Sequence, residues 1–162
     1  MDSTITAFRF TLSYAKDLVH DIDDADMAQM PHPGMNHPAW ILGHLALGAD
    51  FVSLLLGGEL ETDEQWMKTY GPGSQPIDDR SAYASKAELL SLMDQLYERA
   101  EKIASAATEE QLAGPNQTPF LVEQFPTVGD LLIHLLTTHP ASHLGQLSAW
   151  RRCVGKKSVL GV

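Results

Sequence analysis

The sequence predicts an all-α protein, a four-helix bundle with a long crossover between its second and third helices. Four long segments place apolar residues at spacings of three and four, which is the period of a helix with one buried face. No segment shows the apolar–polar alternation of a half-buried strand. The chain has 162 residues, of which 44% are apolar, so we expect residues 1–162 to form a single domain around one core.

The first two helices are expected at residues 3–30 and 39–57. Pro31 ends the first pattern, because proline in a helix interior removes a backbone hydrogen bond and clashes with the preceding turn. The second segment begins beside Pro38, a residue that suits the first turn of a helix. It ends at Gly57, a residue that favours helix termination.

The third helix is expected to begin at Ser85, which is followed three residues later by Glu88. This spacing is typical of a capping box, in which each of the two side chains satisfies a free backbone N–H group. The fourth helix is expected at residues 127–155. The crossover at 58–84 is long for a bundle connection and contains a short helical segment at 62–66.

Charge and composition exclude several classes of function. The sequence has 21 acidic and 11 basic residues, a net charge of −10 with histidine neutral, which argues against binding to nucleic acid or to anionic lipid. Segment 39–58 is apolar but carries Asp50 and a stripe of small residues, so we expect a core helix and no membrane span. The chain shows no signal peptide, and its lone Cys153 cannot form an internal disulfide, so we expect a cytoplasmic protein.

Three of the seven histidines are expected on buried helix faces. His139 and His143 are four residues apart, which places their side chains on one face of the fourth helix, and His44 lies among bulky apolar residues of the second. A buried imidazole needs partners for its ring nitrogens, and three imidazoles that meet in one core can satisfy that need by binding a divalent cation. We therefore predict a metal site at His44, His139 and His143, with coordination positions left open for water or substrate.

The alternative is that these histidines form only a hydrogen-bonded polar network in the core. His134 lies five residues before His139, roughly 140° around a continuous helix, so it is expected to point elsewhere. If the second helix extended toward its N-terminus, His37 would join the buried face, which makes it the reserve ligand. As the sequence stands, we expect solvent or loop positions for His20, His32 and His37.

Other features of the sequence bear on the predicted site. The motifs HExxH and ExxH are missing, which argues against a metalloprotease and against a carboxylate-bridged di-iron bundle. Pro140 lies between the two histidines of the fourth helix and is expected to kink or bulge it. Four apolar side chains of the connections are expected to cover the end of the bundle or to line a pocket mouth: Trp66, Phe120, Leu121 and Phe125.

The sequences WILGHLA at 40–46 and THPASHLGQL at 138–147 resemble the DinB-like family. This is the damage-inducible helical family of metal-dependent enzymes and not the DNA polymerase that shares the label. The resemblance covers nearly the whole chain, and HxxxHxGQ is its most specific part. It implies a four-helix bundle with a long crossover, a homodimer, and a divalent ion, zinc or nickel among others, held by histidines that match His44, His139 and His143. Pro140 departs from the helix-favouring residue that is usual there.

Two functions from different classes remain open. The resemblance implies a thiol-dependent S-transferase or isomerase that uses a small thiol, and a metal ion held by three imidazoles would also suit hydrolysis. A small thiol and a small-molecule electrophile are then the expected partners, and Gln146 is placed to orient a ligand from one turn beyond His143. The alternative is a non-catalytic dimeric bundle that binds a metal or a small ligand.

Overall fold

The computed structural model of the chain describes residues 2–119 and 121–161. These residues form seven α-helices, two short 3₁₀-helices at Asp24–Asp26 and Arg80–Ala82, and no β-strand. The α-helices are α1 (Asp2–Val19), α2 (Pro38–Leu55), α3 (Glu64–Tyr70), α4 (Lys86–Ala106), α5 (Glu109–Ala113), α6 (Val128–Leu136) and α7 (Thr138–Cys153). The predicted all-α fold is confirmed, and the capping box at Ser85 and Glu88 is present at the start of α4.

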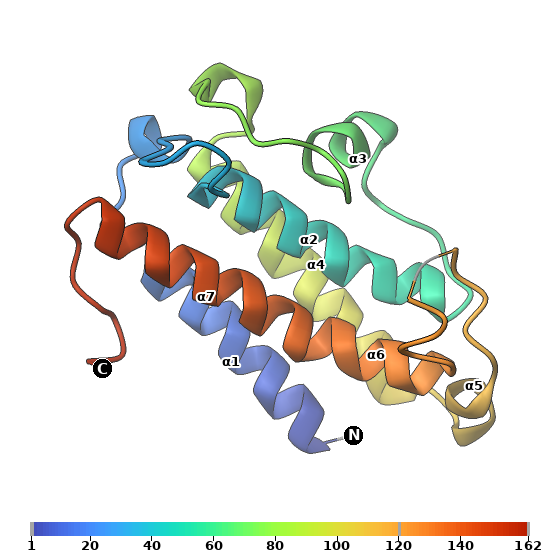
Figure 1. The fold of residues 1–162 in the computed structure, drawn as a ribbon. Helices are drawn as coiled ribbons and strands as arrows, with labels where there is room; N and C mark the ends of the chain where they lie inside the picture. The colour runs from blue at the N-terminus through green and yellow to red at the C-terminus, as the bar shows by residue number, and fades with distance from the viewer. Residues whose placement is uncertain (1, 120, 162) are drawn as a thin grey trace.

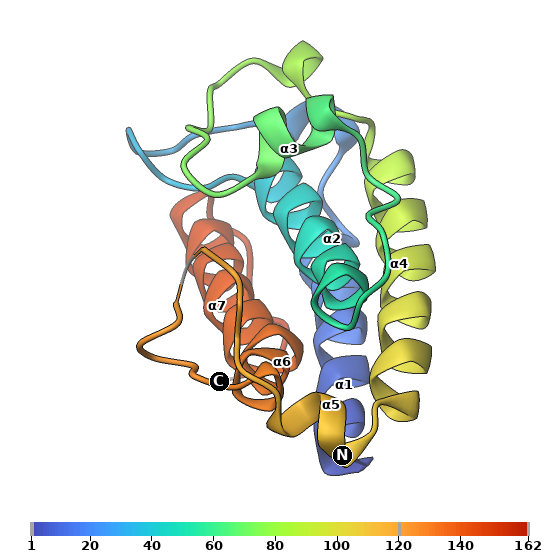
Figure 2. The ribbon, with the colours of Figure 1, turned by 90° about the vertical axis from the view of Figure 1, so that its right-hand side faces the viewer.

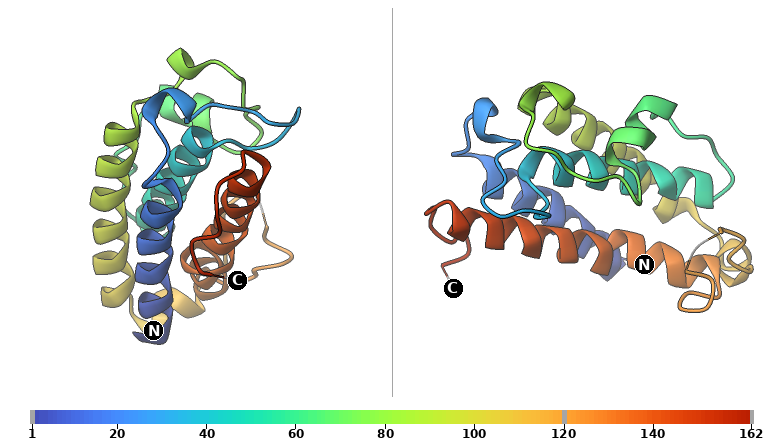
Figure 3. Two further views of the ribbon diagram at one scale, coloured as in Figure 1. Left: turned by 90° about the vertical axis from the view of Figure 1, so that its left-hand side faces the viewer. Right: turned by 45° about the horizontal axis from the view of Figure 1, so that its top comes forward.

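The long helices lie side by side as a bundle (Figures 1 and 2). Three of its rods are α1, α2 and α4, and the fourth is formed by α6 and α7 in succession. The crossover from α2 to α4 carries α3 and the second 3₁₀-helix, and α3 packs on α2 (Figure 3). The predicted long crossover is therefore confirmed.

The second helix is the central element of the core. It contacts α3, α4, α6 and α7, and 14 of its 18 residues are buried, which is why its sequence is apolar on nearly every side. In the described part of the chain it is the one helix long and apolar enough to cross a membrane. Because most of that helix is buried inside the protein, its composition is that of a core helix.

The first helix is shorter than the sequence predicts. It ends at Val19 and not at Met30, and the chain then turns through Asp24–Asp26. Arg151, which is 3% exposed, donates to the carbonyl of Leu18, and so takes one of the acceptors that a continuing helix would use. A run of acidic residues at the negative end of a helix is also unfavourable.

The predicted fourth helix, 127–155, is two helices separated at Thr137, whose φ and ψ are −132° and −76°. The amide of Thr137 closes α6 by donating to the carbonyl of His134 at 3.2 Å, and α7 then begins at Thr138. Pro140 therefore lies in the first turn of a new helix, where its missing N–H costs little. The expectation of a single helix with a kink or bulge at Pro140 is therefore wrong, because the chain breaks at Thr137, three residues earlier.

A buried carboxylate fixes the beginning of the crossover. The side chain of Asp50 has no exposed surface, and it accepts hydrogen bonds from the amides of Glu61 and Thr62, both at 2.9 Å. Its other oxygen forms an ion pair with Arg99 of α4 at 2.9 Å. Because both oxygens are satisfied, Asp50 ties the crossover to α2 and α4 without leaving a buried charge unpaired.

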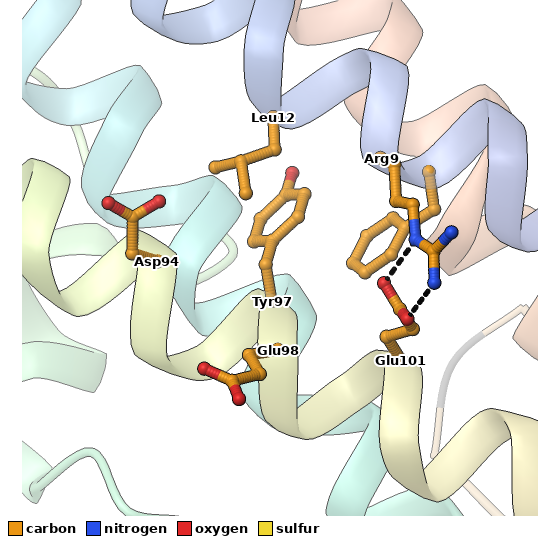
Figure 4. Close-up of a pocket in the computed structure, with 7 residues that line it drawn as sticks. Arg9, Leu12, Asp94, Tyr97, Glu98 and Glu101 are labelled. Atoms are coloured by element: carbon orange, nitrogen blue, oxygen red, sulfur yellow. Dashed lines mark hydrogen bonds and ion pairs between the residues drawn. The ribbon is translucent and has the colours of Figure 1, made fainter.

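The helices α1 and α4 pack against each other along another face of the bundle (Figure 4). Phe8 of α1 stacks on Tyr97 of α4 with ring centroids 4.2 Å apart. Arg9 reaches across the same face to both carboxylate oxygens of Glu101, as the dashed lines in Figure 4 show. This aromatic and ionic contact holds α1 against α4.

Candidate metal centre

The structure brings together the three histidines that the sequence singles out. His44 comes from α2, and His139 and His143 come from α7. One ring nitrogen of each lies within 4.8 Å of the others, and the Nε2 atoms of His44 and His139 are 3.1 Å apart. Nitrogen ligands placed about 2.1 Å from one ion are separated by about 3.0–3.4 Å in octahedral or tetrahedral geometry. The separation of His44 and His139 therefore fits a shared divalent cation, and His143 lies close enough to be its third ligand.

The hydrogen bond made by His44 fixes which of its nitrogens carries a proton. Its Nδ1 lies 2.7 Å from the carbonyl oxygen of Tyr70, and since a carbonyl only accepts, Nδ1 is the donor. The Nε2 of His44 then carries no proton, and its lone pair is directed toward His139. The close packing of Tyr70 on Gly43, where an added Cβ would lie 2.2 Å from the ring, holds this carbonyl in place.

His143 is oriented by a side-chain amide. The Oε1 atom of Gln146 lies 3.1 Å from the Nδ1 of His143 and also accepts a hydrogen bond of 2.9 Å from the Nδ2 of Asn36. Because this oxygen can only accept, the Nδ1–H group of His143 donates the hydrogen bond, and the Nε2 of His143 then carries a lone pair. Gln146 therefore holds one of the three imidazoles from one helical turn away, in the manner of a residue that supports a metal ligand.

His139 packs against a position of α2 that has no side chain. A Cβ atom added at Gly48 would lie 2.8 Å from the Cε1 of His139 and 3.1 Å from its Nδ1, both closer than ordinary contact. Glycine at this position therefore makes room for the imidazole. The close approach of α2 and α7 at this point is what brings His139 to His44.

All three imidazoles are held in the neutral form. Burial, and after it the neighbouring histidines, lower the pKa of His139 to about 3. Burial also lowers the pKa of His143 to about 4 and that of His44, against the opposing effect of the hydrogen bond to Tyr70. Neutral imidazole is the form that binds metals, so the site presents ligands at neutral pH without first losing protons.

The triad lies in the wall of a cavity of about 540 Å³. Trp40 stacks on His44 with ring centroids 4.6 Å apart and also lines this cavity. Of the side chains expected near a pocket mouth, Leu121 lines the cavity, with a positive φ of 57°. Trp66 instead donates to the carbonyl of Gly43 in α2, and Phe120 lies outside the described residues.

The structure corrects the prediction for His134. This side chain lines the same cavity, its ring stacks on Phe125 at 4.5 Å, and its Nδ1 lies 2.6 Å from the hydroxyl of Thr138. The helical-wheel estimate assumed one continuous helix, and the break at Thr137 changes the rotation between His134 and His139. His134 is not one of the three clustered residues, but it belongs to the wall around them.

The remaining histidines lie away from the cluster. His37 precedes α2 as expected, but it is fully buried, and its Nδ1 caps the helix by accepting from the amide of Trp40 at 3.2 Å. His37 is therefore a helix cap and not the reserve metal ligand that the sequence offered. Burial lowers the pKa of His37 to about 4. The predicted exposure is confirmed for His20 and His32.

Comparison with known proteins agrees with this architecture. The model of the DinB superfamily matches residues 7–147. A crystal structure of a conserved protein from Enterococcus faecalis has a similar fold, with a TM-score of 0.77 over 96% of this chain and 97% of that chain, at 17% sequence identity. No curated protein matches the sequence. Since the family match covers most of the chain, this protein belongs to the DinB superfamily.

Proposed function

We propose that the protein is a divalent-metal-dependent enzyme whose metal ligands are His44, His139 and His143. The observation that carries the proposal is the 3.1 Å approach of two Nε2 atoms, His44 and His139, where the first must present a lone pair. A cation between them, completed by His143, satisfies these buried nitrogens together. Zinc or nickel is the proposed ion, because imidazole ligands suit both.

The reaction we propose is thiol transfer to a small electrophile, with metal-assisted hydrolysis as the second form of the same chemistry. A divalent ion held by three neutral imidazoles would supply a Lewis acid that lowers the pKa of a thiol or a water. The protein itself orients the ligands. The carbonyl of Tyr70 holds His44 in one orientation, and the side chain of Gln146 holds His143. The apolar cavity beside them excludes bulk water and holds the second reactant.

A homodimer is proposed as the assembly. The supporting observation is a groove of about 380 Å³ between α1 and α7, lined by Phe10 and Tyr14, in which Phe10 is 55% exposed. Exposed aromatic side chains around a groove are typical of association surfaces. Light scattering after size-exclusion chromatography tests this directly, and Phe10→Glu is expected to shift a dimer toward the monomer.

The metal site is tested by elemental analysis of protein purified without added metal. We expect close to one divalent ion per chain in the wild type and in His32→Ala, which removes an exposed histidine. His139→Ala is expected to lose the ion while circular dichroism shows its helical content largely retained. A wild-type protein that is normally folded and metal-free would refute the site.

Turnover distinguishes the enzyme from a non-catalytic binding bundle. Metal-loaded protein is incubated with a small thiol and a chloro-aromatic electrophile, and separately with a phenyl ester. We expect a rate that His44→Ala abolishes and His32→Ala leaves unchanged. Retention of the metal without any rate above that of His44→Ala would favour the non-catalytic bundle.

A further inference from the structure

The crossover makes a tight turn at residues 71–74, directly after α3. The amide of Ser74 donates to the carbonyl of Gly71 at 3.1 Å, and Gly73 has a positive φ of 86°. Proline at the second position and a glycine of positive φ at the third are typical of a type II turn, and Pro72 and Gly73 occupy these positions. Pro72 also lines the cavity beside the triad, so the turn borders the candidate metal site.

The turn brings a hydroxyl group to the indole of Trp40. The Oγ of Ser74 donates to the carbonyl of Gly71 at 2.8 Å and accepts from the Nε1–H group of Trp40 at 2.9 Å. A hydroxyl has one proton to donate, so its bond to Gly71 leaves its lone pairs for the indole, which can only donate. Trp40 is 6% exposed, and Ser74 is the partner that its buried N–H group requires.

The indole of Trp40 in turn lies face to face on the imidazole of His44. The ring centroids are 4.6 Å apart and the ring planes differ by 11°. The hydrogen bond from the Nδ1 of His44 to the carbonyl of Tyr70 fixes where that nitrogen points, and the indole face restricts the tilt of the ring. The two contacts together set the direction of the Nε2 atom, which faces His139.

Two consecutive carbonyl groups of the crossover therefore hold His44. The carbonyl of Tyr70 accepts its hydrogen bond directly. The carbonyl of Gly71 acts indirectly, because it fixes the hydroxyl of Ser74, and that hydroxyl fixes the indole that covers His44. Tyr70 is 2% exposed, so the backbone that carries both carbonyls is anchored in the core.

We propose that Ser74 is a positioning residue for the metal ligand His44 and that it acts through the indole of Trp40. This rests on the proposed function, because it takes His44 to be a metal ligand. Without the hydroxyl, the indole N–H group loses its acceptor, and Trp40 no longer holds the plane of the imidazole. Metal–ligand distances tolerate deviations of only about 0.2 Å, so the metal affinity falls although every ligand is still present.

The first test is the zinc dissociation constant, measured by competition with a chromogenic chelator. We expect Ser74→Ala to weaken zinc binding about three- to tenfold, less than the loss of about 10- to 100-fold that follows when a direct partner of a ligand is removed. Ser74→Thr keeps the hydroxyl and should stay within twofold of the wild type. The matched control is Ser81→Ala, which removes an exposed hydroxyl from the same crossover and should also change the constant less than twofold.

The second test needs no metal. The face of an indole shifts the proton signals of a ring stacked on it upfield, so nuclear magnetic resonance of chelator-treated protein reports the contact of Trp40 with His44. The ring signals of His44 are identified by their loss in His44→Ala. We expect them to move downfield in Ser74→Ala and to keep their positions in Ser74→Thr and Ser81→Ala.

A double variant tests the route from Ser74 to His44. Trp40→Phe keeps an aromatic face but has no N–H group for Ser74 to accept. If Ser74 acts through the indole, adding Ser74→Ala to Trp40→Phe should weaken zinc binding less than twofold further, whereas independent effects would multiply. Multiplied losses, or unmoved His44 signals in Ser74→Ala, would overturn the proposal.

These measurements separate the proposal from the proposed function. If the wild type binds no zinc but the His44 signals still move in Ser74→Ala, Ser74 orients His44 and the metal-dependent function is refuted. If the wild type binds zinc and Ser74→Ala binds it equally tightly, the positioning role of Ser74 is refuted and the proposed function stands.

Discussion

Substitution of Gly48 by alanine tests whether the spacing of α2 and α7 sets the metal geometry. The added Cβ would lie 2.8 Å from the Cε1 of His139, so the ring must retreat by about 0.6 Å to reach the 3.4 Å of ordinary contact. Metal–ligand distances tolerate deviations of only about 0.2 Å. Because supporting changes of this kind weaken metal binding by about 10- to 100-fold, we expect a loss of that size in Gly48→Ala.

Gly145→Ala is the matched control for this experiment. Gly145 is in α7, and an added Cβ there meets no atom within 4 Å. Both substitutions replace glycine by alanine inside a helix, which by itself stabilises a protein by about 0.5–1 kcal/mol. Only Gly48→Ala also pushes on His139, so a difference in metal affinity between the two variants reports the steric contact alone.

The assay is competition with a chromogenic chelator, which gives the metal dissociation constant of each variant. Thermal unfolding is followed in parallel, and Gly145→Ala is expected to raise the melting temperature without changing the metal affinity. If Gly48→Ala binds the metal as tightly as the wild type, the position of His139 is not set by its contact with Gly48, and the reasoning from helix spacing is wrong.

Three further predictions follow from individual side chains. The pKa of His37 falls from 6.5 to about 4 on folding, so the unfolded chain binds the proton first and stability is lost as the pH falls from 6.5 to 4. His37→Asn keeps a capping side chain but cannot take up this proton, so between pH 7 and pH 4.5 its free energy of unfolding should fall by about 2 kcal/mol less than that of the wild type. Urea unfolding at the two pH values measures both losses, and equal losses would contradict this. Asp50→Asn removes the buried charged acceptor of Glu61, Thr62 and Arg99, and because Arg99 keeps its ion pair with Glu61, we expect the fold to lose about 1–3 kcal/mol, whereas an unchanged urea midpoint would show that the crossover is held by other contacts. Gln146→Leu removes the acceptor of His143 and should weaken metal binding about tenfold with the melting temperature little changed, and an unaltered dissociation constant would deny Gln146 its orienting role.

The parts of the structure that the sequence predicts well are those determined by local periodicity. The bounds of α2 and the start of α4 were predictable because a proline and a capping box lie at helix ends, where they satisfy or avoid free N–H groups. The convergence of His44 with His139 and His143 followed from their common position on buried faces. Spacing along a helix specifies a face, and buried faces meet in a bundle.

The features that were missed depend on contacts between distant segments. α1 stops at Val19, where the guanidinium of Arg151, more than 130 residues away, takes a carbonyl of its last turn. The wheel position of His134 could not be predicted, because the exact residue at which a proline-containing helix breaks depends on packing. A histidine before a helix reads as a loop residue, and only the tertiary structure shows that His37 is a buried cap.

The two halves of the candidate metal site are far apart in the chain. His44 and His139 are separated by 95 residues, so an ion that joins them would close most of the polypeptide into a ring. A covalent cross-link of that span restricts the unfolded chain by roughly 4–5 kcal/mol in the chain-entropy view. The lone Cys153 cannot supply such a link within one subunit, and a coordinated metal would be a reversible substitute that a chelator can open.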